Sequence, residues 1–325
     1  VVRNANAAEK HARLQPIIRH THKILDWTLR GTEETALVVA DTETSPVVSQ
    51  TTAGVFSTFG IDPTVLVVPQ QDAPNLEPPD SVATAATATD AIVNLGTYPI
   101  LHSEAIQGAI RDRDVRYLYL AGTTEEYFCR GAVEADPASL DDLTRRLHDR
   151  LRQADRVAVT CPHGTDVSFR IDGDRRHPFT GYPAGETPTC PIEESVNGTI
   201  VVDSYMMGVG LVSEPITWAV EDGWVTDITG GPSARRLREV LREYGDENAR
   251  RIGEFSIMTN PCARPNGIYI EHLSVAGGTH FALGDGTSLG GAYSSSIHLD
   301  GAQLEPSVSL DGTTVVERGS LTFGR

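Results

Sequence analysis

The chain has 325 residues, of which 39 % are hydrophobic and 22 % charged, so it can form one large domain or two ordinary ones with packed cores. Its 44 acidic and 27 basic residues give a formal charge of −17. This charge excludes a non-specific nucleic-acid binder and a partner at an anionic membrane surface, because both need a basic face.

No segment approaches the roughly 18 consecutive apolar residues that a transmembrane helix requires, so no membrane partner is expected. The four cysteines are scattered without a CxxC pair, and the first residues lack the charged, apolar and small regions of a signal peptide. We therefore expect reduced thiols and a cytoplasmic location.

Helix-like and strand-like segments alternate through the first half of the chain. Apolar residues at helical spacing predict helices at 9–29, 45–59, 81–89, 103–110 and 140–154. Short apolar runs predict strands at 36–40, 64–68, 91–95, 115–120 and 156–160. This alternation is typical of βαβ units, so we predict a Rossmann-like α/β domain over residues 1–157. Because no glycine-rich phosphate-binding motif follows these strands, no nucleotide is expected.

The composition changes at Cys161, where Gly and Pro become frequent and short alternating segments replace the helices. Alternation over 167–171, followed by Asp172-Gly173, predicts a hairpin, and 218–225 predicts another. We therefore predict a strand-rich α+β domain over residues 158–325.

Side chains that can bind a metal ion gather in this second half. If the H-x-D pair lies on a strand, period two places His298 and Asp300 on one face. His280 lies in a small and apolar segment, and Glu254 heads an apolar run where a carboxylate is rarely buried unless paired or metal-bound. These residues also have ordinary structural explanations. His298 and Asp300 can form a surface pair, and His280 can be a hydrogen-bonded core histidine. Glu186, on a loop between Gly and Pro residues, can simply face solvent.

The run Cys161-Pro162-His163 is a further feature of the second half. It can supply a thiol nucleophile or a ligand, or it can form a strand end and a tight turn. Its spacing fits no protease or zinc pattern, which favours the turn. No G-x-S-x-G motif is present, so no serine nucleophile is predicted.

Five motifs in the second half occur in a recognisable order: G-x-P-x-G-E-x-x-T-x-P-x-E, N-G-T-I-x-V-D, G-E-x-x-x-x-T-N-P, G-T-H-F-A-L-G and H-x-D-G. Together they resemble the thermophilic-type metallo-aminopeptidases of peptidase family M29, aminopeptidases T and S, and their smaller relatives. The resemblance covers most of residues 160–325, and it is vaguer over the first half.

This resemblance implies a set of metal ligands, namely Glu186, Glu254, His280, His298 and Asp300. It implies a divalent-metal-dependent hydrolase that cleaves an amide or related bond of a small molecule or short peptide by metal-activated water. Glu186 or Glu254 would also act as a general base. One or two ions are expected, with Zn²⁺ favoured over Co²⁺, Mn²⁺ or Fe²⁺, and a homodimer is implied.

The chain departs from the peptidase pattern where those enzymes carry a Tyr that assists the transition state. Thr287 occupies that position here, and Tyr293 is the nearest substitute unless it is a turn or packing residue. The departure fits a relative that acts on another amide or on a small cyclic compound.

The same superfamily contains the 2,5-dihydroxypyridine 5,6-dioxygenases, which share the final H-x-D and resemble a two-His-one-carboxylate iron site. Their third ligand is a His where this chain has Glu254, and they lack counterparts of Glu186 and His280. The hydrolase is therefore the main prediction. A mononuclear Fe(II) ring-cleaving dioxygenase, with His280, His298 and Asp300 as its triad, is the alternative, and a non-catalytic small-molecule-binding protein is the second.

Overall fold

A computed structural model describes residues 2–175 and 177–323 of the chain, with the side chains of the first helix from residue 14 onward. The chain divides into two units, Val1–Glu134 and Ala135–Arg325. The predicted domain boundary after residue 157 lies beyond helix α5 (Pro137–Gln153), which belongs to the second unit.

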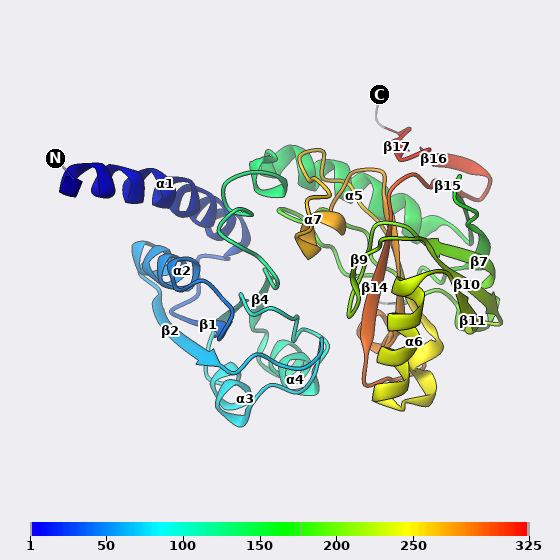
Figure 1. The fold of residues 1–325 in the computed structure, drawn as a ribbon, viewed down its shortest axis with the longest axis horizontal. Helices are drawn as coiled ribbons and strands as arrows, with labels where there is room; N and C mark the ends of the chain where they lie inside the picture. Colours follow the sequence, from blue (N-terminus) through cyan, green and yellow to red (C-terminus); the bar gives the residue numbers. More distant parts are fainter. Residues whose placement is uncertain (1, 176, 324–325) are drawn as a thin grey trace. The chain divides into compact units, whose positions relative to one another are not determined.

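The first unit contains a four-stranded parallel sheet with the strand order β2-β1-β3-β4 (Figure 1). The strands are β1 (Thr35–Asp41), β2 (Asp62–Val68), β3 (Ala91–Asn94) and β4 (Arg116–Tyr119). The helices are α1 (Val2–Thr28), α2 (Pro46–Thr58), α3 (Asp80–Ala86), α4 (Glu104–Arg113) and the short η1 (Ala132–Glu134). The predicted α/β unit with a parallel sheet is confirmed.

The core of the first unit follows from its sequence periodicity. Strands β1 and β3 are apolar on both faces and buried throughout most of their length, as expected for central parallel strands covered by helices. The apolar sides of α3 and α4 contribute Val82 and Ile106 to a cluster with Leu37, Val39 and Ile92.

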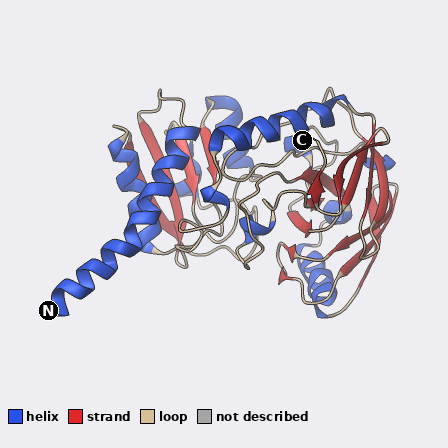
Figure 2. Cartoon of the chain, turned by 90° about the horizontal axis from the view of Figure 1, so that it is seen from above, coloured by secondary structure: helices blue, strands red, loops and turns tan. Residues whose placement is uncertain are grey.

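The second unit consists mainly of two antiparallel sheets (Figure 2). The larger sheet has the order β11-β10-β7-β6-β5-β15-β16-β17 and the smaller one β12-β13-β14-β8-β9. The larger sheet consists of β5 (Arg156–Thr160), β6 (Asp166–Arg170), β7 (Asn197–Val202), β10 (Ile216–Glu221), β11 (Trp224–Thr229), β15 (Ser307–Leu310), β16 (Thr313–Glu317) and β17 (Ser320–Leu321). The predicted strand-rich second half is confirmed.

The smaller sheet consists of β8 (Tyr205–Met206), β9 (Gly210–Leu211), β12 (Ile252–Ile257), β13 (Thr279–Gly284) and β14 (His298–Gln303). Helical segments of this unit, besides α5, are η2 (Glu193–Ser195), α6 (Pro232–Tyr244), η3 (Glu247–Arg250), α7 (Tyr269–His272) and η4 (Thr287–Leu289). None of the helices among the described residues has the length and apolar character needed to cross a bilayer.

Aromatic side chains join the two sheets. Phe169 on β6 meets Phe255 on β12 and Phe281 on β13, with ring centroids 5.0 and 5.9 Å away, and the latter two rings are 5.0 Å apart. All three rings are buried, so one face of the smaller sheet packs on the larger one. Because side chains alternate along a strand, the neighbours of Phe255 and Phe281 point to the opposite face.

One predicted hairpin is wrong. Asp172-Gly173 does begin a turn, in which Arg175 N–H donates to the carbonyl of Asp172. However, the next strand of the sheet, β7, begins only at Asn197, and β6 forms its hairpin with the preceding strand β5. The segment between β6 and β7 contains prolines that interrupt strand pairing, among them Pro178, Pro183, Pro188 and Pro191.

Candidate metal centre

Three adjacent strands place four polar side chains on the face of the smaller sheet that points away from the larger sheet. Ala282 on β13 is the register partner of both Glu254 on β12 and Asp300 on β14. His280 precedes Ala282 by two residues, and His298 precedes Asp300 by two, so all four share one face. Ala282, whose side chain is small, lies between the strand positions of the two carboxylates.

A bulge puts Glu254 on this face. In β12 the register with β13 shifts between Ile252, which faces Leu283, and Glu254, which faces Ala282. Gly253 is the extra residue, and a Cβ there would lie 2.6 and 2.7 Å from the carbonyl oxygens of Gly284 and Asp285. The bulge therefore needs glycine at this position.

The polar atoms of the four side chains converge. Glu254 lies between the two imidazoles: its Oε1 is 3.0 Å from Nε2 of His280, and its Oε2 is 3.1 Å from Nε2 of His298. Asp300 Oδ1 is 3.2 Å from Nε2 of His298 and 3.9 Å from Nε2 of His280. Ligands about 2.1 Å from one cation lie about 3.0 to 3.4 Å apart, so this spacing suits donors around a single ion.

Neighbouring groups fix which atoms face the centre. His298 Nδ1 donates to the carbonyl oxygen of Asp285 at 2.7 Å, so Nε2 carries the lone pair of the neutral ring. Tyr269 on α7 donates its hydroxyl hydrogen to Asp300 Oδ2 at 2.5 Å. The other oxygen, Oδ1, is buried without a hydrogen-bond partner among the described residues. Such support of ligands by surrounding groups is characteristic of metal sites.

The four groups are all less than a tenth exposed, so their charges interact strongly. Burial opposes ionisation of Glu254, but hydrogen bonds from His280 and His298 lower its pKa far below the usual range. Burial likewise opposes charge on His280, yet Glu254 and Asp300 raise its pKa to about 9, and that of His298 rises well above its usual value. The paired carboxylates thus require positive charge here, which protons or a cation can supply.

Glu186 joins the group from a loop of the same unit. Its backbone bridges Thr180 on one side and Met258, just after β12, on the other. Burial raises the pKa of Glu186 to about 8, with further contributions from the carboxylates of Glu254 and Asp300. Glu186 is partly exposed, whereas the other four are buried. The structure therefore brings four of the predicted ligands into contact, and Glu186 lies close enough to interact with their charges.

The glycine that follows Asp300 serves the packing beneath the site. A Cβ at Gly301 would lie 2.6 Å from Val202 Cγ2 and 3.1 Å from atoms of Met206 and Trp218. Gly301 points toward the larger sheet, while Asp300 points away from it. The final G of H-x-D-G is thus explained by the close approach of the two sheets.

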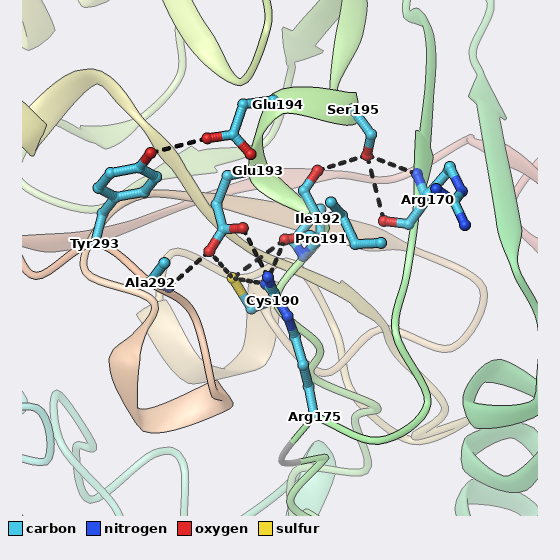
Figure 3. A network of polar contacts seen from close by, with 10 residues as sticks. All are labelled: Arg170, Arg175, Cys190, Pro191, Ile192, Glu193, Glu194, Ser195, Ala292 and Tyr293. Carbon is cyan, nitrogen blue, oxygen red and sulfur yellow. Dashed lines mark hydrogen bonds and ion pairs between the residues drawn. The ribbon is translucent and has the colours of Figure 1, made fainter.

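The structure places Tyr293 beside Glu194 and Arg251, which are not among the candidate metal ligands. Its hydroxyl donates to Glu194 Oε1 at 2.8 Å (Figure 3). The guanidinium of Arg251 lies 3.4 Å from the Tyr293 ring centroid. Thr287 hydrogen-bonds to Asp285. Tyr269, which the sequence analysis missed, is the tyrosine that contacts a candidate ligand. It lies in a stretch without a recognisable motif, so no local signal singles it out.

A buried ion pair anchors the segment between β13 and β14, which contains Asp285. Arg175 Nη2 lies 2.8 Å from Glu193 Oε2, and Glu193 Oε1 accepts the backbone N–H of Ala292 at 2.7 Å (Figure 3). Beside this pair, Cys190 Sγ would lie 2.9 and 2.8 Å from a Cβ at Gly286 or Gly291. These contacts hold the backbone that orients His298.

Fold and site together define a two-unit protein with a buried histidine–carboxylate cluster of the metal-binding type. The chain matches the 2,5-dihydroxypyridine 5,6-dioxygenase family over residues 28–323 and belongs to that family.

A curated relative, 2,5-dihydroxypyridine 5,6-dioxygenase of Pseudomonas putida KT2440, is 28 % identical over 152 residues. That match spans 43 % of this chain and 43 % of the relative, so it covers less than half of either.

Two solved structures share the fold. The 2,5-dihydroxypyridine dioxygenase from Pseudomonas putida KT2440 has a TM-score of 0.76 at 20 % identity, covering 95 % of this chain and 97 % of that one. Wild-type AmpT from Thermus thermophilus has a TM-score of 0.66 at 18 % identity, covering 95 % and 99 %. The predicted superfamily includes both kinds of protein, and both have the fold of this chain.

The main functional prediction from sequence is wrong. The chain belongs to a dioxygenase family, so the aminopeptidase-like hydrolase of the M29 type is replaced by the alternative reading. The five motifs that suggested a peptidase consist largely of residues that can bind a metal ion and of closely packed glycines. Such residues indicate a shared fold, but they do not determine which reaction the site catalyses. A divalent-metal centre remains consistent with the cluster, but the expected preference for Zn²⁺ is not confirmed.

Proposed function

We propose that the chain is an Fe(II)-dependent ring-cleaving dioxygenase whose substrate is a hydroxylated pyridine or a closely related small heterocycle. The family match over residues 28–323 carries this proposal. The name of the curated relative supplies the substrate class.

The donor set fits iron. His280, His298 and Asp300 provide two imidazoles and one carboxylate, the ligand set of non-haem Fe(II) oxygenases, and Glu254 offers a further oxygen. Oδ1 of Asp300 supports this reading, because this buried anionic oxygen faces the two imidazoles and needs positive charge, which a cation bound between them would supply. When bound, Fe(II) would supply open coordination positions and redox chemistry that the protein side chains lack.

The surrounding residues would hold and shield this centre. Tyr269 keeps Asp300 turned so that Oδ1 faces the cluster, and the Asp285 carbonyl keeps Nε2 of His298 directed there. Burial of the four donors excludes bulk water. Glu186 is the partly exposed member, and with its pKa raised to about 8 its carboxyl group would exchange a proton with a substrate hydroxyl arriving from solvent.

Oxygen consumption by the iron-loaded protein tests the proposal. The chain is loaded with Fe(II) without oxygen, mixed with 2,5-dihydroxypyridine and then exposed to oxygen. We expect oxygen uptake together with loss of the ring's near-ultraviolet absorption. His298→Ala and Asp300→Asn should lose bound iron and oxygen uptake, whereas His22→Ala, an exposed histidine in the first unit, should retain both.

Two results would overturn the proposal. One is absence of oxygen uptake with a panel of hydroxylated pyridines while iron is bound at the cluster, which would indicate a binding protein. The other is full activity in Asp300→Asn, which would place the chemistry elsewhere.

A further inference from the structure

A second group of metal-binding side chains lies at one edge of the larger sheet in the second unit. Cys161 follows β5, His163 lies in the turn between β5 and β6, and Asp203 follows β7. Because β6 pairs antiparallel with β5 on one side and with β7 on the other, the β5–β6 turn and the C-terminal end of β7 lie at the same end of these strands. One sulfur, one nitrogen and one oxygen donor from these residues all lie within 4.8 Å of one another.

From this arrangement we propose that Cys161, His163 and Asp203 form a second divalent-metal site, separate from the histidine–carboxylate cluster and suited to Zn²⁺. Thiolate, imidazole and carboxylate are all established Zn²⁺ ligands. Three protein ligands leave a fourth position for water or for a small anionic ligand.

The backbone fixes the turn that carries two of these ligands. The N–H of Cys161 donates to the carbonyl of Thr165 at 3.0 Å, and the N–H of Gly164 donates to the carbonyl of Cys161 at 3.1 Å. The Thr165 hydroxyl oxygen accepts the N–H of Val201 on β7 at 2.9 Å. The predicted tight turn is therefore present, and it is bound to the strand that leads to Asp203.

Asp203 is a preformed anionic ligand. One carboxylate oxygen accepts the backbone N–H of Leu304 at 3.1 Å, and the other lies 2.8 Å from Nδ1 of His163. The Asp203 side chain is only 6 % exposed, whereas that of His163 is 49 % exposed. Asp203 is thus held in place while the imidazole can rotate.

The three donor atoms need to approach one another only slightly to bind one Zn²⁺ ion. Ligands of a tetrahedral Zn²⁺ lie about 3.3 to 3.8 Å apart, given metal–ligand distances of about 2.0 to 2.3 Å. Donor atoms already within 4.8 Å need only side-chain rotation of the exposed His163 and of Cys161. The spacing C-x-H hides this site from sequence inspection, because the third ligand comes from a strand forty residues further along.

Cobalt(II) binding distinguishes this site from the first one. Thiolate-bound Co²⁺ gives a sulfur-to-metal charge-transfer absorption that imidazole and carboxylate ligands do not give. We expect this absorption when the full chain is titrated with Co²⁺, and its loss in Cys161→Ser. Cys129→Ser, a matched change in the first unit, and Asp300→Asn, in the first metal site, should both retain it.

Alkylation of the wild-type chain with and without Zn²⁺ gives a second measurement. Zn²⁺ should slow modification of Cys161 by iodoacetamide at least tenfold, and His163→Ala should abolish this protection. Absence of the charge-transfer band, its persistence in Cys161→Ser, or equal alkylation of Cys161 with and without Zn²⁺ would each overturn the proposal. In that case His163 and Asp203 form an ordinary ion pair beside a thiol.

Discussion

The two oxygens of Asp300 have different environments, and this difference sets the geometry of the candidate iron centre. Oδ2 accepts the Tyr269 hydroxyl, and Oδ1 is left facing two imidazoles. A single hydrogen bond thus decides which oxygen is presented to a cation.

We expect Tyr269→Phe to weaken Fe(II) binding about tenfold, because groups that orient metal ligands contribute about 10- to 100-fold to affinity. The ring would keep its contact with Tyr205, whose centroid is 5.6 Å away, so the fold should persist. Anaerobic iron titration measures the effect. Tyr293→Phe is the control, because its hydroxyl bonds to Glu194. Unchanged iron affinity in Tyr269→Phe would show that Asp300 is oriented by other contacts.

At the scale of whole elements, the close approach of the two sheets limits side-chain size. We expect Gly301→Ala to destabilise the chain by about 1 to 3 kcal/mol, the usual cost of overpacking, because its Cβ meets Val202, Met206 and Trp218. Urea unfolding gives the free-energy difference. Gly54→Ala in helix α2 has nothing within 4 Å and should be neutral or stabilising. Equal stability of the two alanine variants would contradict the packing argument.

The segment between β13 and β14 depends on the ion pair of Arg175 and Glu193. Burial raises the pKa of Glu193, but the Arg175 guanidinium and the Ala292 N–H outweigh it, so the net pKa lies below its usual 4.5. The folded state therefore prefers the ionised form. Its stabilising effect is complete above pH 4.5 and is lost as the pH falls through the lowered pKa.

Accordingly, we expect Glu193→Gln to lose about 1 to 3 kcal/mol of stability at pH 7, since bonds to charged groups contribute that much. The difference from wild type should shrink as the pH falls below 4.5. Urea unfolding across pH 3 to 7 measures it, with the exposed Glu194→Gln as control. A difference that stays constant with pH would exclude ionisation of Glu193 as its cause.

Sequence periodicity was sufficient for the helices and strands of the first unit, because each is defined by local spacing. The start of α5, in the second unit, is equally local, because Asp136 caps this helix by accepting the N–H of Ser139, three residues away. The second unit depends on pairing between distant strands, which local patterns do not encode. His298 and Asp300 were recognisable within one strand, but the contact of Tyr269 with Asp300 arises only from tertiary packing.

The whole molecule concentrates both candidate metal sites in the second unit, Ala135–Arg325. A ligand stabilises only the state that binds it, by about 2.7 kcal/mol at a concentration one hundred times its Kd. We expect Fe(II) to slow hydrogen exchange in β12, β13 and β14 more than in β1 and β3. Asp300→Asn should lose this protection. No protection in wild type would contradict iron binding at the cluster, and equal protection of both units would show that they unfold together.

The bulge at Gly253 determines which face of β12 carries the Glu254 side chain. Counting residues from Ile252 without the bulge would set Glu254 opposite Phe281 instead of Ala282. If β12 instead kept regular pairing through Gly253, Glu254 and Phe255 would exchange faces, and the carboxylate would point at the aromatic contact between the sheets. The bulge in β12 therefore decides whether this sheet offers a cation three neighbouring donors or four.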